Sequence, residues 1–264
     1  MRKIFVTENV QTFADEQAET FLKTKNDLEF FNEEEQGIHK VPEERWKMAQ
    51  KYERRTWMEL SLSTKDDRNF DHIEKFDSFN TIKDEFSNKN SVIELGCGPF
   101  TNLRLLTDMF ANSQLVLLDP LINDYISHEN CSYKTGSLNG KKVSLINSTI
   151  EEFNPNNYSY EIPDKFDAVI MMNVIEHCFD VNAIFDKILQ ILNKDGIFIF
   201  ADVYFKDVRT LVSNLYDAGH PLRLSELKMN EFLKNFKSIF DKRYHGLFGQ
   251  EWRNDIYFVG EKHK

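Results

Sequence analysis

The sequence predicts an α/β domain built on a mostly parallel β-sheet and preceded by a helical N-terminal region. From Ser91 onward, short apolar runs alternate with segments of helical periodicity. This pattern is typical of parallel strands that are buried on both faces by crossover helices. Residues 1–90 are rich in charge instead and contain no strand-like run after "KIFV". We therefore expect a helical cap over residues 1–90 and an α/β domain over residues 91–264.

The N-terminal region contains one strong helical signal. In "PEERWKMAQKYERRTWMEL", which starts at Pro42, large residues recur at steps of three and four, as in an amphipathic helix. Pro42 and the two glutamates after it suit the first helical turn. We interpret the apolar stripe as a packing surface, with Trp57 as the one tryptophan that also lines a ligand pocket. A second helix is expected from Asp71 to Phe86.

The α/β domain is expected to contain seven strands and three long helices. The strands are predicted at residues 91–96, 114–120, 142–149, 195–203, 237–245 and 255–262, and a further strand within residues 166–177 runs into a turn. The helices are predicted at residues 102–111, 181–193 and 225–236. Helices between successive strands favour parallel pairing, because parallel strands need long crossover connections.

The composition indicates which kind of partner the protein binds. The chain has 33 Lys and Arg against 43 Asp and Glu, a formal charge of -10, which argues against nucleic-acid binding and favours a small-molecule partner. Cys97, Cys131 and Cys178 are widely spaced and indicate reduced thiols, not a disulfide framework or a zinc site. No apolar stretch approaches the roughly 20 residues of a membrane span, and no signal peptide is recognised. We expect a cytoplasmic protein.

The first strand ends in a glycine turn, "VIELGCGPF". A strand, a glycine turn and a helix in this order bind ligands at the carboxyl end of a parallel sheet. A dinucleotide site would need a third glycine after Gly96 and Gly98, but this chain continues with Pro99, Phe100 and Thr101. Glu94 also brings negative charge into the turn, which disfavours a diphosphate and suits an ammonium group.

Two further clues lie at the ends of later strands. Asp119 follows Gly96 by 23 residues and ends the second strand, where a carboxylate can accept hydrogen bonds from both hydroxyls of a ribose. Asn173, Glu176 and His177 follow the fourth strand in "NVIEHCFD". A ligand with an amino acid end, a ribose and no phosphate matches S-adenosylmethionine.

Four segments resemble the successive motifs of class I S-adenosylmethionine-dependent methyltransferases. They are "VIELGCGPF", "LLDP", "FDAVIMMNVIEHCFD" and "LNKDGIFIFADV", in this order between Ser91 and Val203. The resemblance implies a Rossmann-like, seven-stranded, mostly parallel sheet whose last strand is antiparallel. It also implies S-adenosyl-L-methionine as the cofactor and S-adenosyl-L-homocysteine as its product.

The resemblance assigns the cofactor contacts to residues at the carboxyl edge of the sheet. They are Glu94, Gly96, Cys97 and Gly98 for the methionine part, Asp119 and Pro120 for the ribose, Thr149 and Ile150 for the adenine, and Asn173 and Val174 for the sulfur. Cys97 serves there as a small residue of the turn, not as a nucleophile.

A hydroxyl acceptor must lose a proton when it is methylated. His177 is the first candidate for the base, because it follows the fourth strand on the side that faces the methyl group. His220 and His245 are rivals, since both lie in connections that pass over the substrate mouth of this fold. Asp202, at the end of the fifth strand, is a further candidate as base or metal ligand, but no ligand motif predicts a bound metal.

The N-terminal segment points to one class of acceptor. "GIHKVPEERWKMAQKYERRTWMEL" is similar to the corresponding part of sugar O-methyltransferases from bacterial capsular-polysaccharide clusters, which methylate sugars such as heptoses on a nucleotide. The similarity implies a nucleotide-sugar acceptor in capsule biosynthesis. Its diphosphate would need cationic partners, and Arg54, Arg55 and Arg223 are the candidates. The helical N-terminus could also join two subunits in a homodimer.

Two alternatives stay open from the sequence. The first is O- or N-methylation of a lipid-like or aromatic metabolite, which predicts an apolar acceptor cavity without paired arginines. The second is a non-catalytic S-adenosylmethionine-binding subunit, which would keep Gly96, Gly98 and Asp119 but would need no acid–base group near the methyl group.

Overall fold

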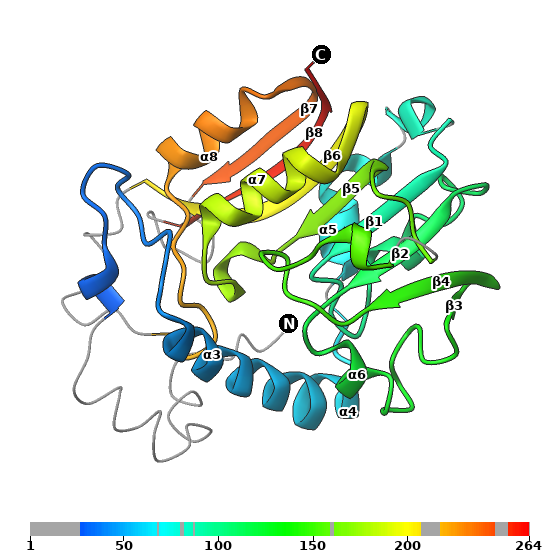
Figure 1. The fold of residues 1–264 in the computed structure, drawn as a ribbon, viewed down its shortest axis with the longest axis horizontal. Coiled ribbons are helices and arrows are strands. Elements are labelled where there is room, and N and C mark those ends of the chain that lie inside the picture. Colours follow the sequence, from blue (N-terminus) through cyan, green and yellow to red (C-terminus); the bar gives the residue numbers. More distant parts are fainter. Residues whose placement is uncertain are drawn as a thin grey trace.

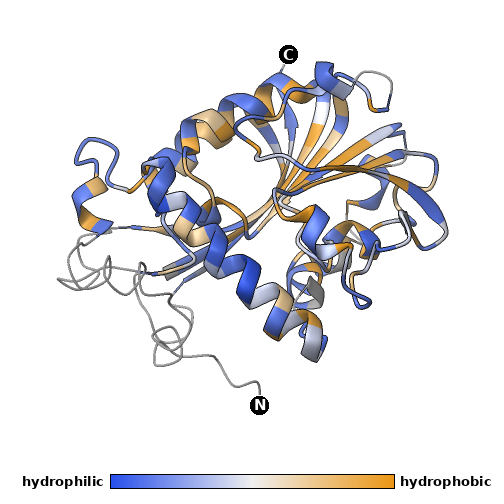
Figure 2. Cartoon of the chain, turned by 60° about the horizontal axis from the view of Figure 1, so that its bottom comes forward, coloured by the Kyte–Doolittle hydropathy of each residue, from blue (hydrophilic) through white to orange (hydrophobic). Residues whose placement is uncertain are grey.

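The computed structural model describes residues 27–67, 69–79, 82–86, 88–158, 161–206, 217–245 and 253–263. Of the expected helical cap, residues 1–26 lie outside this set. Figure 1 shows that the described residues form a twisted sheet with helical segments against both of its faces. Figure 2 shows the apolar residues concentrated in the strands.

The sheet contains eight strands in the described part of the chain, in the order β3-β4-β2-β1-β5-β6-β8-β7. The strands are β1 Ser91–Leu95, β2 Gln114–Leu118, β3 Ser137–Leu138, β4 Lys141–Ile146, β5 Phe166–Met172, β6 Leu192–Phe205, β7 Phe236–His245 and β8 Arg253–Lys262. β4, β2, β1, β5 and β6 are parallel, and β8 is antiparallel to both β6 and β7. Because Ile93 is level with Val116 and Val169, the carboxyl ends of β1, β2 and β5 meet at one edge.

This topology confirms the predicted α/β class and the antiparallel last strand, but the predicted number of seven strands is wrong. The extra strand is β3, which pairs with β4 in a hairpin. Asn139 and Gly140 connect the two strands, and both have positive φ, 48° and 81°. Asn-Gly with left-handed backbone at both positions is typical of a tight hairpin turn, so the sequence contains a signal for β3.

Helices cover the two faces of the sheet. On one face, α7 (Val181–Ile191) and α8 (Glu226–Leu233) bury their apolar sides in one part of the core. Asp180 and Ser225 cap these helices by accepting hydrogen bonds from Ala183 N and Lys228 N, and such caps contribute about 1 kcal/mol each. On the other face lie α5 (Asn69–Lys75) and the 3₁₀ turns η3 (Asp77–Phe79), η4 (Lys83–Phe86) and η5 (Asn102–Leu105).

Two of the expected helices are shorter than predicted. The helix expected from Asp71 to Phe86 ends with α5, because Asp77 and Phe79 adopt positive φ of 53° and 58°, which a helix does not tolerate. The helix expected at residues 102–111 is the 3₁₀ helix η5 followed by turns. The remaining short elements are η1 Asp27–Phe30, α6 Ile122–Tyr125, η6 Pro155–Tyr158 and η7 Ile175–His177.

The predicted amphipathic helix is present and lies across the carboxyl edge of the sheet (Figure 1). It begins as α3 (Glu43–Arg55), continues through a π-helical turn, η2 (Thr56–Ser61), and ends as α4 (Leu62–Thr64). Arg45 anchors it, donating to both carboxylate oxygens of Asp27 and to the carbonyls of Asp217 and Ala218. This buried guanidinium fixes the helix against residues 217–218.

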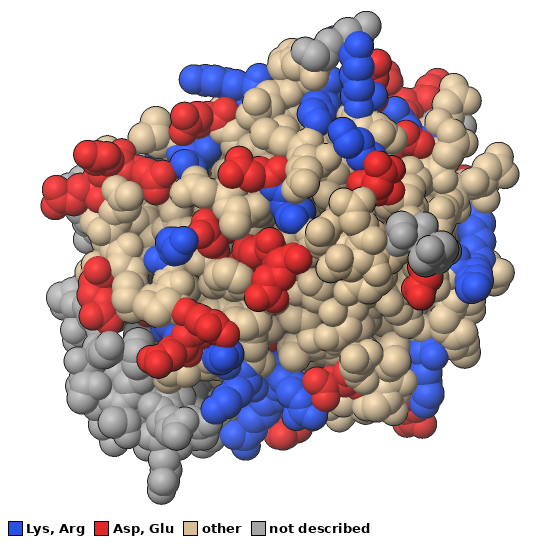
Figure 3. Space-filling view, in the orientation of Figure 1, with Lys and Arg blue, Asp and Glu red and all other residues tan. Residues whose placement is uncertain are grey.

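None of the described helices combines the length and the apolar character that are needed to cross a membrane. Figure 3 shows acidic and basic side chains interspersed over the face in view. The chain carries more acidic than basic residues, in line with the expectation of a small-molecule partner.

Candidate functional site

A cavity opens at the carboxyl edge of the sheet, between the ends of β1, β2 and β5 and helix α3. Its walls come from the glycine turn after β1, the segments after β2, β4 and β5, and the inner side of α3 and η2. The lining residues are Trp46, Gln50, Glu53, Trp57, Gly96, Gly98, Asp119, Pro120, Leu121, Tyr125, Thr149, Ile150, Glu151, Asn173, Val174, His177 and Cys178. Most of the predicted cofactor residues are therefore gathered around one cavity.

The glycine turn forms one wall of the cavity. Gly96 has a φ of +66°, and a Cβ added there would lie 2.5 Å from Cγ1 of Val174. Only glycine fits this position, because both the backbone angle and the neighbour exclude a side chain. Gly98 also has positive φ, +55°, but a Cβ added there would meet no atom within 4 Å, so the turn leaves open space on that side.

Glu94, before the turn, and Cys97, within it, are not among the lining residues of the cavity. The carboxylate of Glu94 is buried and accepts hydrogen bonds from the backbone N–H groups of Asn102 and Leu103 and from the Thr101 hydroxyl. Burial raises the pKa of Glu94, and these hydrogen bonds lower it in part. Through these hydrogen bonds Glu94 fixes the turn to the first residues of η5.

Cys97 is a packed thiol, as expected. Burial raises its pKa well above the usual value, and its Sγ lies 3.6 Å from the Tyr133 hydroxyl. A nucleophilic cysteine needs a lowered pKa. This environment therefore agrees with the interpretation of Cys97 as a small residue of the turn.

Asp119 ends β2 and faces the cavity. Its Oδ2 accepts a hydrogen bond from Gly98 N at 3.0 Å, and its Oδ1 accepts one from Leu121 N at 2.8 Å. Burial raises the pKa of Asp119 to about 6, against the lowering effect of these N–H groups. Each carboxylate oxygen can accept a second hydrogen bond, so the two backbone bonds orient the group and leave it able to bind a diol.

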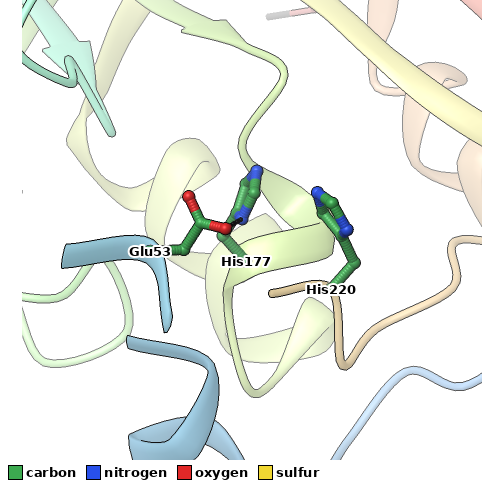
Figure 4. Close-up of side chains that lie close together, drawn as sticks. All are labelled: Glu53, His177 and His220. Carbon is green, nitrogen blue, oxygen red and sulfur yellow. Dashed lines mark ion pairs between the residues drawn. The ribbon is translucent and has the colours of Figure 1, made fainter. Parts of the chain in front are cut away.

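His177 lies at the end of η7, where the chain leaves β5. Its Nδ1 donates to the carbonyl of Gly219 at 3.1 Å and lies 3.4 Å from Oε1 of Glu53. Burial lowers the pKa of His177, but the charge and hydrogen bond of Glu53, together with Glu176 and Asp202, raise it to about 9. The His220 ring lies beside it, with 4.6 Å between ring centroids (Figure 4).

Glu53 is a site residue that the sequence prediction missed. Glu53 is buried in α3. Burial raises the pKa of Glu53, but the charge and the hydrogen bond of His177 outweigh this effect, so that the pKa is lowered. Its position gives a signal that could have identified it. Trp46, Gln50, Glu53 and Trp57 follow one another at helical steps and all line the cavity, so they share one face of the helix.

Asp202 and His245 lie outside the cavity lining. Asp202 is buried below the turn after β5, where it accepts hydrogen bonds from the N–H groups of Val174 and Ile175. Burial raises its pKa to about 7 despite these bonds, and its contacts hold the turn in place. His245 lies on β7, with its Nδ1 2.8 Å from Oδ1 of Asn254.

The candidate phosphate-binding arginines already have acidic partners. Arg54 pairs with Asp124, Arg55 with Glu59, and the buried Arg223 with Glu176. Among the described residues that line the cavity there are three carboxylates, Glu53, Asp119 and Glu151, but no lysine or arginine. The cavity therefore favours a cationic or uncharged ligand over a phosphate.

Comparison with known sequences gives one family match and one curated relative. The family model of the methyltransferase domain matches residues 42–237. The chain is 29% identical over 163 residues to a mitochondrial ubiquinone biosynthesis O-methyltransferase of Dictyostelium discoideum, which is 57% of this chain and 48% of the relative. The chain thus spans about half the length of that relative.

Solved structures share the fold at low sequence identity. The 1,6-didemethyltoxoflavin-N1-methyltransferase of Burkholderia thailandensis has a TM-score of 0.57 and 12% identity, over 85% of this chain and 91% of that one. The N-methyltransferase NodS of Bradyrhizobium japonicum has a TM-score of 0.52 and 14% identity, over 82% and 99%. A polyketide-synthase O-methyltransferase of Brevibacillus brevis has a TM-score of 0.53 and 14% identity, over 85% and 82%. All three contain S-adenosylhomocysteine.

Proposed function

The chain belongs to the methyltransferase-domain family and uses S-adenosylmethionine as methyl donor, and we propose that it methylates a hydroxyl group of a small, uncharged aromatic molecule. One observation carries the proposal. The same cavity is lined by the glycine turn and Asp119 from the sheet edge, by Trp46 and Trp57 from the helix, and by His177. A nucleoside-binding wall, an aromatic wall and an ionisable group thus meet in one place.

The residues present fit the cofactor. The open space at Gly98 and the exclusion of a side chain at Gly96 leave the turn accessible to a ligand. Asp119 would accept the ribose hydroxyls, Thr149 and Ile150 would border the adenine, and Asn173 and Val174 would lie beside the sulfur. S-adenosylmethionine supplies a methyl group on a positively charged sulfur, and that charge suits a cavity lined by three carboxylates.

The lining of the cavity supports an aromatic acceptor. Trp46 packs edge-on against Phe179, and Trp57 lies 11 residues, about three helical turns, further along the same side of the helix. Indole rings stack on flat aromatic ligands and bury large apolar areas. The curated relative is named as an O-methyltransferase of ubiquinone biosynthesis, which also supports hydroxyl methylation.

The nucleotide-sugar acceptor remains a prediction with less support. A diphosphate in this cavity would meet Glu53, Asp119 and Glu151, and burying like charges together is costly. Arg54, Arg55 and Arg223 would have to leave their acidic partners to bind it. We therefore place the aromatic acceptor first.

His177 is the candidate that handles the acceptor's proton. It is the one residue of the four predicted candidates, His177, His220, His245 and Asp202, that lines the cavity in the described part of the chain. Holding the hydroxyl in line with the methyl group can supply about 7 to 11 kcal/mol of the barrier reduction. Trp57 and the Glu53–His177 pair would provide that alignment.

The experiment is a methyl-transfer assay with a set of acceptors. The protein is incubated with S-adenosylmethionine and either catechol, a UDP-sugar or a GDP-sugar, and the products are analysed by mass spectrometry. We expect one added methyl group on the catechol and none on the sugars. Methylation of a nucleotide sugar alone would contradict the aromatic acceptor, and cofactor binding without turnover of any acceptor would favour a non-catalytic subunit.

A further inference from the structure

Three ionisable side chains that are far apart in the sequence meet beside the cavity, and two of them, Glu53 and His177, line it. Glu53 comes from α3, His177 from the end of η7, and His220 from residues 217–220. Figure 4 shows the carboxylate of Glu53 and the two imidazole rings facing one another. One potential ligand atom from each of the three residues lies within 4.8 Å of the other two.

From this geometry we infer that Glu53, His177 and His220 bind a divalent transition-metal ion that activates the acceptor hydroxyl. The inference rests on the proposed function for the role of the ion, but not for its binding. Three atoms within 4.8 Å of one another have a common point no more than about 2.8 Å from each, and zinc needs about 2.0 to 2.2 Å. Side-chain shifts of less than about 1 Å therefore complete the site.

The two histidines are held by oxygen atoms in the way that metal-binding histidines are. Nδ1 of His220 pairs with Oδ1 of Asp217 at 2.8 Å, and Nδ1 of His177 donates to the Gly219 carbonyl at 3.1 Å. A ring N–H directed at a carboxylate or a carbonyl fixes the tautomer and leaves the other nitrogen available to a metal. Nδ1 of His177 also lies 3.4 Å from Oε1 of Glu53, so an ion bound here would replace this ion pair. Asp217 and Gly219 thus act as positioning residues.

The segment that carries His220 is itself fixed in place. Arg45 donates to the carbonyls of Asp217 and Ala218, and Gly219 N donates to Oδ1 of Asp217 at 3.2 Å. His220 is about one-third exposed, whereas Glu53 is buried. The hydrogen bonds therefore hold the site rigidly, while the exposed side of His220 gives an ion access from solvent.

The donor set selects the kind of ion. Two imidazoles and one carboxylate suit zinc and other first-row divalent ions, whereas magnesium and calcium prefer oxygen ligands only. Three protein ligands also leave a position for a further ligand, as in catalytic zinc sites. Because Glu53 and His177 line the cavity, that position faces the place where the acceptor would bind. An ion there would lower the pKa of a bound hydroxyl, so that its proton passes to solvent water before the oxygen attacks the methyl group. With the ion bound, His177 acts as a ligand and the ion takes over the activation of the hydroxyl.

The first test is metal binding by untagged protein that has been stripped with EDTA and dialysed. Titration with Zn²⁺ is followed by calorimetry, and Co²⁺ is added separately to record its visible absorption. We expect one Zn²⁺ per chain for the wild-type protein and for the exposed-histidine control His263→Gln, and at least tenfold weaker binding for Glu53→Gln and for His220→Ala. Absence of a one-to-one site, or equal binding by all variants, would overturn the inference.

A second measurement separates this inference from the proposed function. Binding of S-adenosylhomocysteine is measured on the same stripped protein, and thermal unfolding confirms that each variant is folded. If S-adenosylhomocysteine binds but Zn²⁺ does not, the metal site is refuted and the proposed function stands. If Zn²⁺ binds but S-adenosylhomocysteine does not, the proposed function fails instead. We also expect methyl transfer by the stripped protein to return when one equivalent of Zn²⁺ is added.

Discussion

Gly219 lies directly against Glu53: a Cβ added to Gly219 would lie 2.2 Å from Oε1 of Glu53 and 3.0 Å from Cδ1 of Tyr52. The backbone at Gly219 therefore lies too close to α3 to leave room for a side chain. The same approach lets the Gly219 carbonyl accept a hydrogen bond from Nδ1 of His177. A glycine at this position is needed for the arrangement of Glu53, His177 and His220.

We predict that Gly219→Ala destabilises the chain and that the loss depends on Glu53. The added methyl group must displace the Glu53 carboxylate, so the variant should lose about 1 to 3 kcal/mol of unfolding free energy. In a Glu53→Ala background the same change should cost less, with an interaction energy of at least about 0.5 kcal/mol. Thermal unfolding of the four proteins in this cycle provides the measurement, and additive losses would contradict the predicted contact.

We predict that Gly96→Ala weakens cofactor binding at least tenfold. The positive φ of Gly96 disfavours alanine by about 1 kcal/mol or more, and the new methyl group would collide with Val174. Val174 would move towards the position predicted for the sulfur. Calorimetry with S-adenosylhomocysteine should show at least tenfold weaker binding, and an unchanged affinity would show that this turn does not contact the ligand.

We predict that His177→Gln and Glu53→Gln both slow methyl transfer. His177 faces the acceptor side of the cavity and Glu53 holds its ring, so loss of either should lower kcat about 100-fold. The affinity for S-adenosylhomocysteine should change much less. The matched controls are His263→Gln and Glu59→Gln, which replace exposed residues outside the cavity and should leave turnover unchanged.

We predict that binding of S-adenosylhomocysteine weakens as the pH falls below about 6. Burial raises the pKa of Asp119 to about 6, and only the ionised carboxylate accepts hydrogen bonds from both ribose hydroxyls. The pKa of Asp119 in the folded chain lies above the usual 3.8. Ionisation of Asp119 therefore lowers the free energy of unfolding as the pH rises from about 4 to 6, and this loss stays constant above pH 6. Affinity measured from pH 5 to 8 should fall by up to about tenfold per unit below 6.

The control for this pH dependence is Asp119→Asn. Its side chain does not titrate, so its affinity should be lower at pH 7.5 and nearly independent of pH. A variant profile that still fell below pH 6 would assign the titration to another group.

We predict that His72 contributes to acid sensitivity away from the cavity. Burial, with the nearby charge of Lys75, lowers the pKa of His72 to about 4. The unfolded chain protonates this residue near pH 6.5 but the folded chain does not, so stability is lost as the pH falls from about 6.5 towards 4. Thermal unfolding at pH 7.5 and 5 should show a smaller drop for His72→Gln than for the wild-type protein.

The sequence was sufficient for the parts of the fold that depend on local pattern. The alternation of apolar runs and helical periodicity predicted every strand of the sheet except β3, together with α7 and α8, because burial on both faces produces that pattern. The order of Gly96, Asp119 and Asn173 predicted one ligand site, since parallel strands end at the same edge. The hairpin at Asn139 and Gly140 was missed although its turn signal is present.

The acceptor side of the cavity could not be predicted in the same way. Glu53 and His220 are 167 residues apart, and their contact depends on how α3 crosses the sheet edge and on the anchoring of residues 217–218 by Arg45. The prediction that arginines of this chain bind a diphosphate was made without knowledge of their partners in the fold. Only the tertiary structure supplies Asp124 as the partner of Arg54 and Glu176 as the partner of Arg223. The partner of Arg55, Glu59, lies four residues along the same helix and could have been recognised in the sequence.

The most direct test of the central claim is a crystal structure of the chain with S-adenosylhomocysteine at saturating concentration. We predict that the ribose hydroxyls lie within hydrogen-bonding distance of the Asp119 carboxylate and that the sulfur lies beside Asn173 and Val174. A ligand bound elsewhere on the molecule, or a cavity without ligand under these conditions, would contradict the account.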